Sequence, residues 1–102
     1  IKISYTGIVA DYGVGEGLGF SVENSRSESI IVNMVDASYN DTMSAVIQPQ
    51  VPLNVIIAGK KAEQPFVFSN KKFNGGKVQF KFRVLDENYK ELFTTDFLEI
   101  TL

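Results

Sequence analysis

The sequence predicts an all-β domain, an antiparallel β-sandwich of about seven to eight strands. Three observations predict this fold class. Apolar and polar residues alternate with a period of two along most of the 102 residues, as expected for strands that bury one face. Stretches rich in Gly, Pro, Asn, Asp and Ser separate the alternating runs. No stretch of about ten residues shows a convincing helical period.

The first half of the chain supplies four expected strands. Residues 1–9 (IKISYTGIV) and 17–24 (GLGFSVEN) alternate apolar with polar residues, and a glycine-rich turn joins them. The polar stretch ENSRSES leads into 29–36 (SIIVNMVD), and a further turn leads into 42–47 (TMSAVI). The β-branched residues of 37–47 argue against a helix there.

The second half supplies four more. The prolines of QPQVP separate 42–47 from 53–58 (LNVIIA), and the AGKK turn precedes 63–69 (EQPFVFS). Residues 77–85 (KVQFKFRVL) alternate most clearly, and the last strand is 96–102 (DFLEITL). About eight short strands in one domain, residues 1–102, favour a two-sheet sandwich closer to the immunoglobulin type than to a closed barrel.

Composition excludes several classes of function. The formal net charge is −2, from 10 basic and 12 acidic residues, so we expect no nucleic-acid partner. The absence of Cys and His excludes disulfides, ordinary zinc sites and nucleophilic triads. We therefore expect no catalysis, no cofactor and no metal. The apolar runs are too short for a membrane helix. A start at Ile1 rather than Met leads us to expect upstream sequence.

The stretch DYGVGEGLGF (11–20) carries four glycines at alternate positions, which raises the question of a phosphate-binding loop. Its spacing fits neither the dinucleotide fingerprint nor the Walker motif, no Lys follows, and a strand comes next rather than a helix. We interpret Gly13 and Gly15 as a pliable turn. Gly17 and Gly19 are expected to belong to the following strand.

Two polar stretches carry oxygen ligands of the kind that calcium takes, DASYND (36–41) and DEN (86–88). Neither has the EF-hand pattern. Asp and Asn are also the residues that turns prefer, because they hydrogen-bond to their own backbone. We expect turns and no metal at both places, and calcium binding is the alternative that stays open.

The tyrosines suggest a recognition surface. If every connection reverses the chain, the loops near 11–16, 37–41, 59–61 and 86–90 share one end of the sandwich. That end would gather three tyrosines and polar neighbours, a composition typical of binding loops. The candidate ligand-binding residues are Tyr12, Tyr39, Asn40, Asp41, Asn88 and Tyr89. The alternative is that these tyrosines cap the ends of the core.

Three short motifs carry a resemblance to a known family. They are Phe20-Ser21-Val22-Glu23-Asn24, the AGKK turn at 58–61, and the FKF strand from Phe80 to Asp86. The chain resembles an uncharacterised immunoglobulin-like domain of surface lipoproteins from Gram-positive gut bacteria (Firmicutes). It departs from that pattern at the short segment FNGGK (73–77), which replaces a longer one.

The resemblance implies an extracytoplasmic, cell-surface location with a possible lipid anchor upstream, and it carries over no catalytic residue. We expect a non-catalytic binding or structural spacer module whose partner is a protein or a glycan. The alternative is a carbohydrate-binding module that uses the loop tyrosines as sugar platforms.

Overall fold

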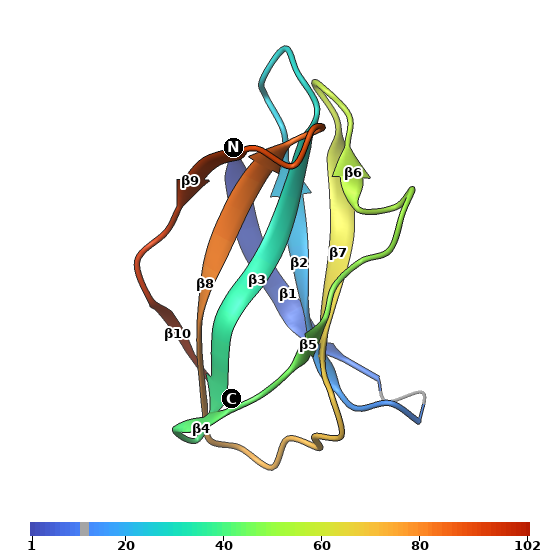
Figure 1. Ribbon diagram of the computed structural model, residues 1–102. Coiled ribbons are helices and arrows are strands. Elements are labelled where there is room, and N and C mark those ends of the chain that lie inside the picture. The colour runs from blue at the N-terminus through green and yellow to red at the C-terminus, as the bar shows by residue number, and fades with distance from the viewer. Residues whose placement is uncertain (11–12) are drawn as a thin grey trace.

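The computed structural model describes residues 1–10 and 13–102, and within them the protein is all-β (Figure 1). Two antiparallel sheets pack face to face as a sandwich, which confirms the predicted fold class. The described strands are β1 (Lys2–Val9), β2 (Gly17–Glu23), β3 (Ile30–Tyr39), β4 (Thr42–Met43), β5 (Val46–Ile47), β6 (Val55–Ile56), β7 (Lys61–Phe68), β8 (Lys77–Asp86), β9 (Glu91–Thr94) and β10 (Leu98–Thr101).

The strand order is that of an immunoglobulin sandwich. One sheet has the order β1-β2-β7-β5, and the other has the order β10-β8-β3-β4, with β6 pairing to β3 and β9 to β8. The first order corresponds to the A-B-E-D sheet of immunoglobulin domains, and β10-β8-β3 corresponds to G-F-C. The short β4 and β6 both extend the second sheet beyond β3.

The core consists of the alternating apolar residues that the sequence places on one face of each strand. In β8 the four residues from Val78 to Val84 at alternate positions are all buried. Four phenylalanines meet at the centre, and the Phe20 and Phe82 rings pack edge to face with centroids 5.0 Å apart. Phe66 and Phe80 complete the group. Burial of a Phe side chain contributes about 1.5–3 kcal/mol.

Glycines at the start of β2 and just before it let the chain approach β7 closely. A Cβ at Gly17 would lie 2.5 Å from the carbonyl oxygen of Phe66 on β7, and one at Gly15 would overlap the carbonyl of Phe68. Gly17 and Gly19 belong to β2, as expected. The adjoining loop is tied down by Glu16, whose Oε1 accepts the N–H of Phe73 at 2.8 Å.

The last strand differs from the prediction because it is interrupted. The prediction covers β10 but misses β9, which is short and exposed along its length. Between them Thr95 bonds β8 twice: its N–H donates to the Phe82 carbonyl (2.9 Å), and its hydroxyl accepts the Phe82 N–H (3.0 Å). Together β9 and β10 form one edge strand broken at Thr95. On the opposite edge strand, β1, a bulge lies between Tyr5 and Gly7.

The predicted strand 42–47 splits in two because the chain changes sheet. β4 pairs with β3, β5 pairs with β7, and β6 returns to β3. The β5–β7 ladder ends after Ile47 opposite Val67. In the same register the next hydrogen-bonded pair would be Pro49 opposite Pro65, and neither residue has an N–H to donate.

Side-chain amides then bridge this side of the sandwich. Gln48 Oε1 accepts the N–H of Met34 on β3 at 2.9 Å, and its Nε2 donates to the Met34 carbonyl at 2.7 Å. The Gln48 side-chain amide thereby makes the two hydrogen bonds with Met34 that a strand residue would make in the gap between β4 and β6. Gln64 on β7 donates to the carbonyl of Leu53 at 2.9 Å. We call this side, formed by residues 42–56, the closed side.

Candidate functional site

Asn40 and Asp41 form the tight turn between β3 and β4. Their φ angles are 48° and 67°, as a two-residue hairpin turn of the primed type requires. Asn40 also holds the start of β8: its N–H donates to the Lys77 carbonyl, and its Oδ1 accepts the Lys77 N–H, both at 2.9 Å. Asn40 therefore has a structural role, while Asp41 stays exposed in the turn.

Tyr39 holds the loop 69–76. Its hydroxyl donates to the Gly75 carbonyl at 2.8 Å and accepts the N–H of Asn74 at 3.0 Å. Its ring packs against Phe73 with centroids 5.1 Å apart. The hydroxyl and the ring of Tyr39 both make contacts within the fold, so its side chain serves a structural role.

Asn88 and Tyr89 belong to the hairpin between β8 and β9. Asp86 Oδ1 accepts the N–H groups of Asn88 (2.8 Å) and Lys90 (3.0 Å), and Tyr89 has a φ of 62°. This is a three-residue hairpin loop closed by an aspartate side chain. Tyr89 is 56% exposed, and its hydroxyl oxygen lies 3.5 Å from Nδ2 of Asn54.

The expectation that the three tyrosines share one end of the sandwich is wrong. Tyr39 pairs with Val78 at one end of the β3–β8 ladder, whereas Ile30 pairs with Asp86 at the other end, beside the loop that holds Tyr89. Figure 1 shows these two ends at the bottom and top of the sandwich. Tyr12, the third tyrosine, lies outside the described residues.

The prediction failed because one connection does not reverse the chain. β4 and β6 both run antiparallel to β3, so the chain keeps its direction through the prolines of residues 48–52. Each loop after this connection therefore lies at the end of the sandwich opposite to the predicted one. The loops at 59–61 and 86–90 are both at the top end in Figure 1, opposite the loop at 40–41.

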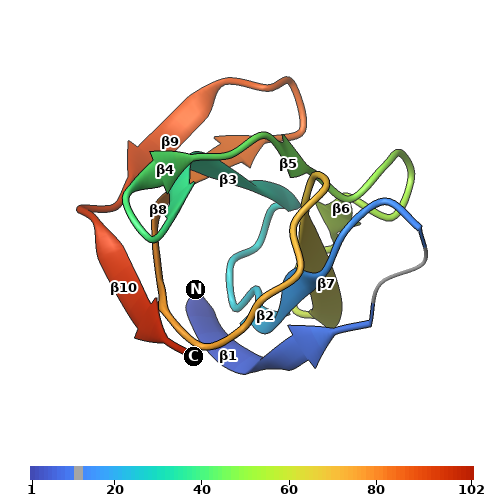
Figure 2. The same cartoon turned by 90° about the horizontal axis from the view of Figure 1, so that it is seen from below.

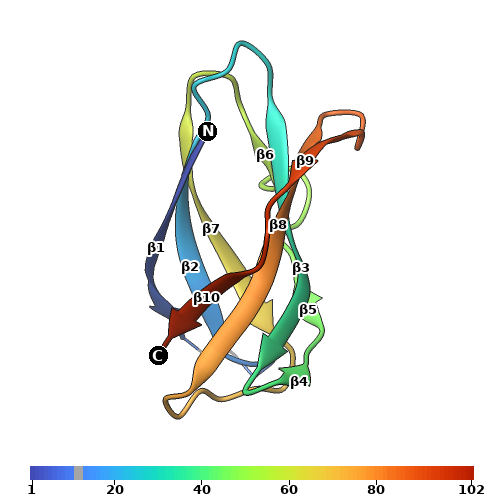
Figure 3. The same cartoon turned by 90° about the vertical axis from the view of Figure 1, so that its left-hand side faces the viewer.

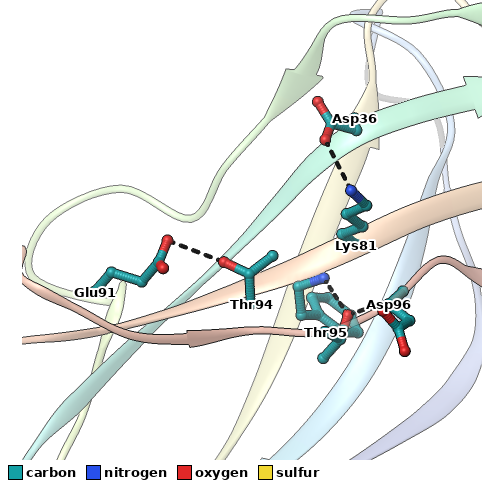
Figure 4. A network of polar contacts seen from close by, with 7 residues as sticks. Asp36, Lys81, Glu91, Thr94, Thr95 and Asp96 are labelled. Atoms are coloured by element: carbon teal, nitrogen blue, oxygen red, sulfur yellow. Dashed lines mark hydrogen bonds and ion pairs between the residues drawn. The ribbon is translucent and has the colours of Figure 1, made fainter.

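The acidic stretches do not gather into a metal centre in the part of the chain that the structure describes. No group of three or more His, Cys, Asp or Glu there could hold a metal ion. Asp36 pairs with Lys81 at 3.7 Å (Figure 4), and the Lys81 ammonium lies 4.5 Å from the centroid of the Phe97 ring. These are contacts on the outer face of the sheet.

The feature that stands out is a groove on the side of the sandwich between β1 and β10. We call it the open groove. It has a volume of about 370 Å³ and is lined by Ile1, Ile3, Tyr5, Phe20, Phe80, Phe82, Phe93, Thr95, Leu98 and Ile100. All of these residues except Thr95 are apolar or aromatic.

Side chains at the rim of the open groove are unusually exposed for their type. Phe93 is 42% exposed, and Tyr5 and Leu98 are each 40% exposed. The Tyr5 ring packs on the buried Phe20 with centroids 5.6 Å apart. Burial raises the pKa of the Tyr5 hydroxyl above its ordinary value.

A larger hollow of about 660 Å³ lies on the closed side, between β7 and the protruding segment 48–53. Its rim carries the exposed Val51 and Leu53. It is bordered by β5, β6 and β7, and among the described residues β5 ends its sheet. Pro49 and Pro65 lie where the next β5–β7 pair would form, and neither has an N–H to donate. The open groove instead lies between two sheet edges, those of β1 and β10, that carry no proline.

The residues of the open groove are not among the candidates that the sequence suggests. Their signal was present, because Ile1, Ile3 and Tyr5 alternate at the start of the chain, and DFLEITL alternates at its end. Alternation alone does not tell which strands are edge strands. That information comes only with the sheet order.

The sequence matches no family model, and comparisons with curated proteins and with solved structures also found no match. In the described residues, no helix is long and apolar enough to cross a membrane. Function is therefore inferred from the geometry of the chain.

Proposed function

We propose that the protein is a non-catalytic binding and spacer module of a bacterial surface lipoprotein. The observation that carries the binding role is the open groove, an apolar groove with an aromatic floor that lies between two unpaired sheet edges. Binding sites are usually concave and lined mainly by apolar and aromatic side chains, as this groove is.

The shape of the domain supports a spacer role. Its extents are 39 × 27 × 20 Å. Ile1 lies toward one end of the long direction and Leu102 toward the other (Figure 1). A domain that the chain enters at one end and leaves at the other separates whatever is attached to its two termini.

The cell-surface location is supported by the resemblance of 20–24, 58–61 and 80–86 to surface lipoprotein domains. Asn24 of the first motif has a structural role that accounts for its place there. It is 1% exposed, and its side-chain amide donates to the carbonyls of Glu28 (2.9 Å) and Ile56 (3.0 Å). It thereby joins the loop 24–29 to β6.

The test of the location is the complete protein expressed with a C-terminal epitope in a Gram-positive host. We expect protease added to intact cells to remove the epitope, and a labelled fatty acid to be incorporated at an upstream cysteine. An epitope that is protected in intact cells and recovered in the cytosol would contradict the proposal.

One observation favours carbohydrate binding as a second candidate. Tyr89 lies exposed beside a polar hollow of about 270 Å³ lined by Glu28, Ser29, Asp86, Glu87 and Asn88. An exposed ring next to carboxylate and amide groups is suited to sugar hydroxyls. Binding on a glycan array that is lost in Tyr89→Ala and kept in Tyr39→Phe would support it, and no binding across a broad array would contradict it.

A further inference from the structure

We propose that the open groove binds an extended segment of a partner protein, which adds as a β-strand between β1 and β10. This inference rests on the proposed binding role and names the chemistry of the partner: a strand whose alternate side chains are apolar. The polar groups of the two bordering strands, their direction and the groove floor together define this occupant.

The outer edge of β1 presents backbone donors and acceptors to the groove. The N–H of Phe68 donates to the Glu16 carbonyl and that of Asn24 to the Lys60 carbonyl, so the even-numbered residues of β2 bond β7. Its odd-numbered residues then bond β1, where their partners include Lys2 and Ser4. The N–H and C=O groups of Ile3 and Tyr5 consequently point to the opposite, outer edge.

The outer edge of β10 also presents backbone donors and acceptors to the groove. The N–H of Leu102 donates to the Gly76 carbonyl at 2.8 Å, in register with Leu98 opposite Phe80. Even-numbered residues of β10 therefore bond β8, and the N–H and C=O groups of Glu99 and Thr101 point outward. In the described part of the chain, β1 and β10 end their sheets, and no strand pairs with either outer edge.

The two edges have compatible directions. Figure 2 shows β10 beside β1 around the sandwich, and Figure 3 shows both strands running the same way. A segment that runs the opposite way between them would be antiparallel to both. Addition of a strand to a free sheet edge is an established mode of peptide recognition, in which the main chain provides affinity and side-chain pockets provide specificity.

The floor of the groove determines the side-chain pattern of the partner. Phe20, Phe80 and Phe82 lie at the bottom, and Phe93 and Leu98 form part of the rim. Inward side chains of the added strand would contact these rings. Its outward side chains would lie beside Lys2 on one edge and Glu99 on the other, so small neutral polar residues suit those positions.

The experiment uses a synthetic peptide of about ten residues in which Val alternates with Thr, with terminal lysines for solubility. A matched peptide carries N-methyl groups on alternate backbone nitrogens, which remove donors but keep the side chains and the charge. Binding is measured by calorimetry, and amide exchange by NMR. We expect the unmodified peptide to bind with a Kd below about 1 mM. N-methylation should raise the Kd at least about tenfold, a change of about 1.4 kcal/mol.

The NMR measurement tests the registers directly. On peptide binding, the amide protons of Ile3, Tyr5, Glu99 and Thr101 are expected to become protected from exchange, because these are the donors that face the groove. Leu98→Asp should weaken binding at least about tenfold. Leu53→Asp, a change at an exposed leucine of the closed side, should leave it unchanged.

Three results would overturn the inference. The alternating peptide fails to bind, or the N-methylated peptide binds equally well, which would indicate an apolar ligand without strand pairing. Alternatively, the protein alone forms a dimer that Leu98→Asp dissociates, which would make a second copy the occupant. None of these results bears on the cell-surface location, which the protease and fatty-acid experiment tests separately.

Discussion

The two sides of this sandwich differ in how the edges of the two sheets are covered. Both sheets end there, and sheet ends leave backbone groups without partners. On the closed side, residues 42–56 cross between the sheets, and the Gln48 amide pairs with Met34 where a strand is missing. On the side of the open groove, the described residues leave both edges unpaired over an aromatic floor. On one side a segment of the chain crosses between the sheets, and on the other no described segment does, so the uncovered edges are a local property of that side.

Proline scanning of β10 provides the largest expected effect. Ile100→Pro should lower the free energy of unfolding by about 3 kcal/mol, because the Ile100 N–H faces β8 and its loss breaks the ladder. Glu99→Pro should cost less than about 1 kcal/mol, because that N–H faces the open groove. Urea unfolding of both variants measures the difference. Equal costs would show that the assigned edge is wrong.

Loss of the closing amide should have the next largest effect. Gln48→Leu leaves the N–H and C=O of Met34 without their partner, and Met34 is buried. We expect about 2 kcal/mol of destabilisation in urea unfolding. Gln50→Leu is the control, because the Gln50 amide makes only an exposed bond to the Gln48 carbonyl. A cost for Gln48→Leu no greater than that of the control would remove the contrast between the sides.

Polar substitution at the rim of the open groove should cost less. Phe93→Ser removes a ring that is 42% exposed, so the loss should be about 1 kcal/mol or less. Phe66→Ser, a change at a fully buried ring, should cost several-fold more. Thermal unfolding compares the two. A large loss in Phe93→Ser would mean that the rim belongs to the core and is not a surface kept for a partner.

The pH dependence of Tyr5 gives the smallest effect. Burial raises the pKa of its hydroxyl in the folded state, so folding favours the neutral phenol. This contribution is fully present below the unfolded pKa of about 10 and is lost as pH rises through the folded pKa. Tyr5→Phe should therefore lose less stability than the wild type as pH rises above about 10, measured as urea midpoints. An identical pH profile in the two proteins would contradict the burial of this hydroxyl.

Much of the fold could be predicted because it depends on local patterns. The alternation in β2 and β8 identified the residues that face the core, although β2 is buried on both faces up to Val22, and the turn residues located the hairpins. The site could not be predicted, because it depends on strand order and direction. The prolines near Pro49 resemble a reversal in sequence, yet the chain continues in one direction and changes sheet. That single difference separates Tyr39 from Tyr89.

The candidate residues show the same limit. Polar turn residues often bind ligands, which makes Asn40 and Asn88 candidates in the sequence. In the structure the Asn40 side chain accepts the Lys77 N–H, and the Asn88 backbone N–H donates to Asp86 Oδ1 within its turn. The sequence suggests Tyr39 as an exposed aromatic, but in the structure its hydroxyl bonds Asn74 and Gly75. Sequence identifies residues able to recognise a ligand, but only tertiary contacts show which of them are already occupied.

The interruptions in the two edge strands have a consequence for solubility. Long, flat, unpaired edges promote uncontrolled association between copies of a protein. Here the bulge after Tyr5 limits the regular edge of β1, and the break at Thr95 separates β10 from β9. Each edge therefore offers only a short template. Copies of the domain should therefore stay dispersed at high concentration, because neither edge is long enough for extended pairing between copies.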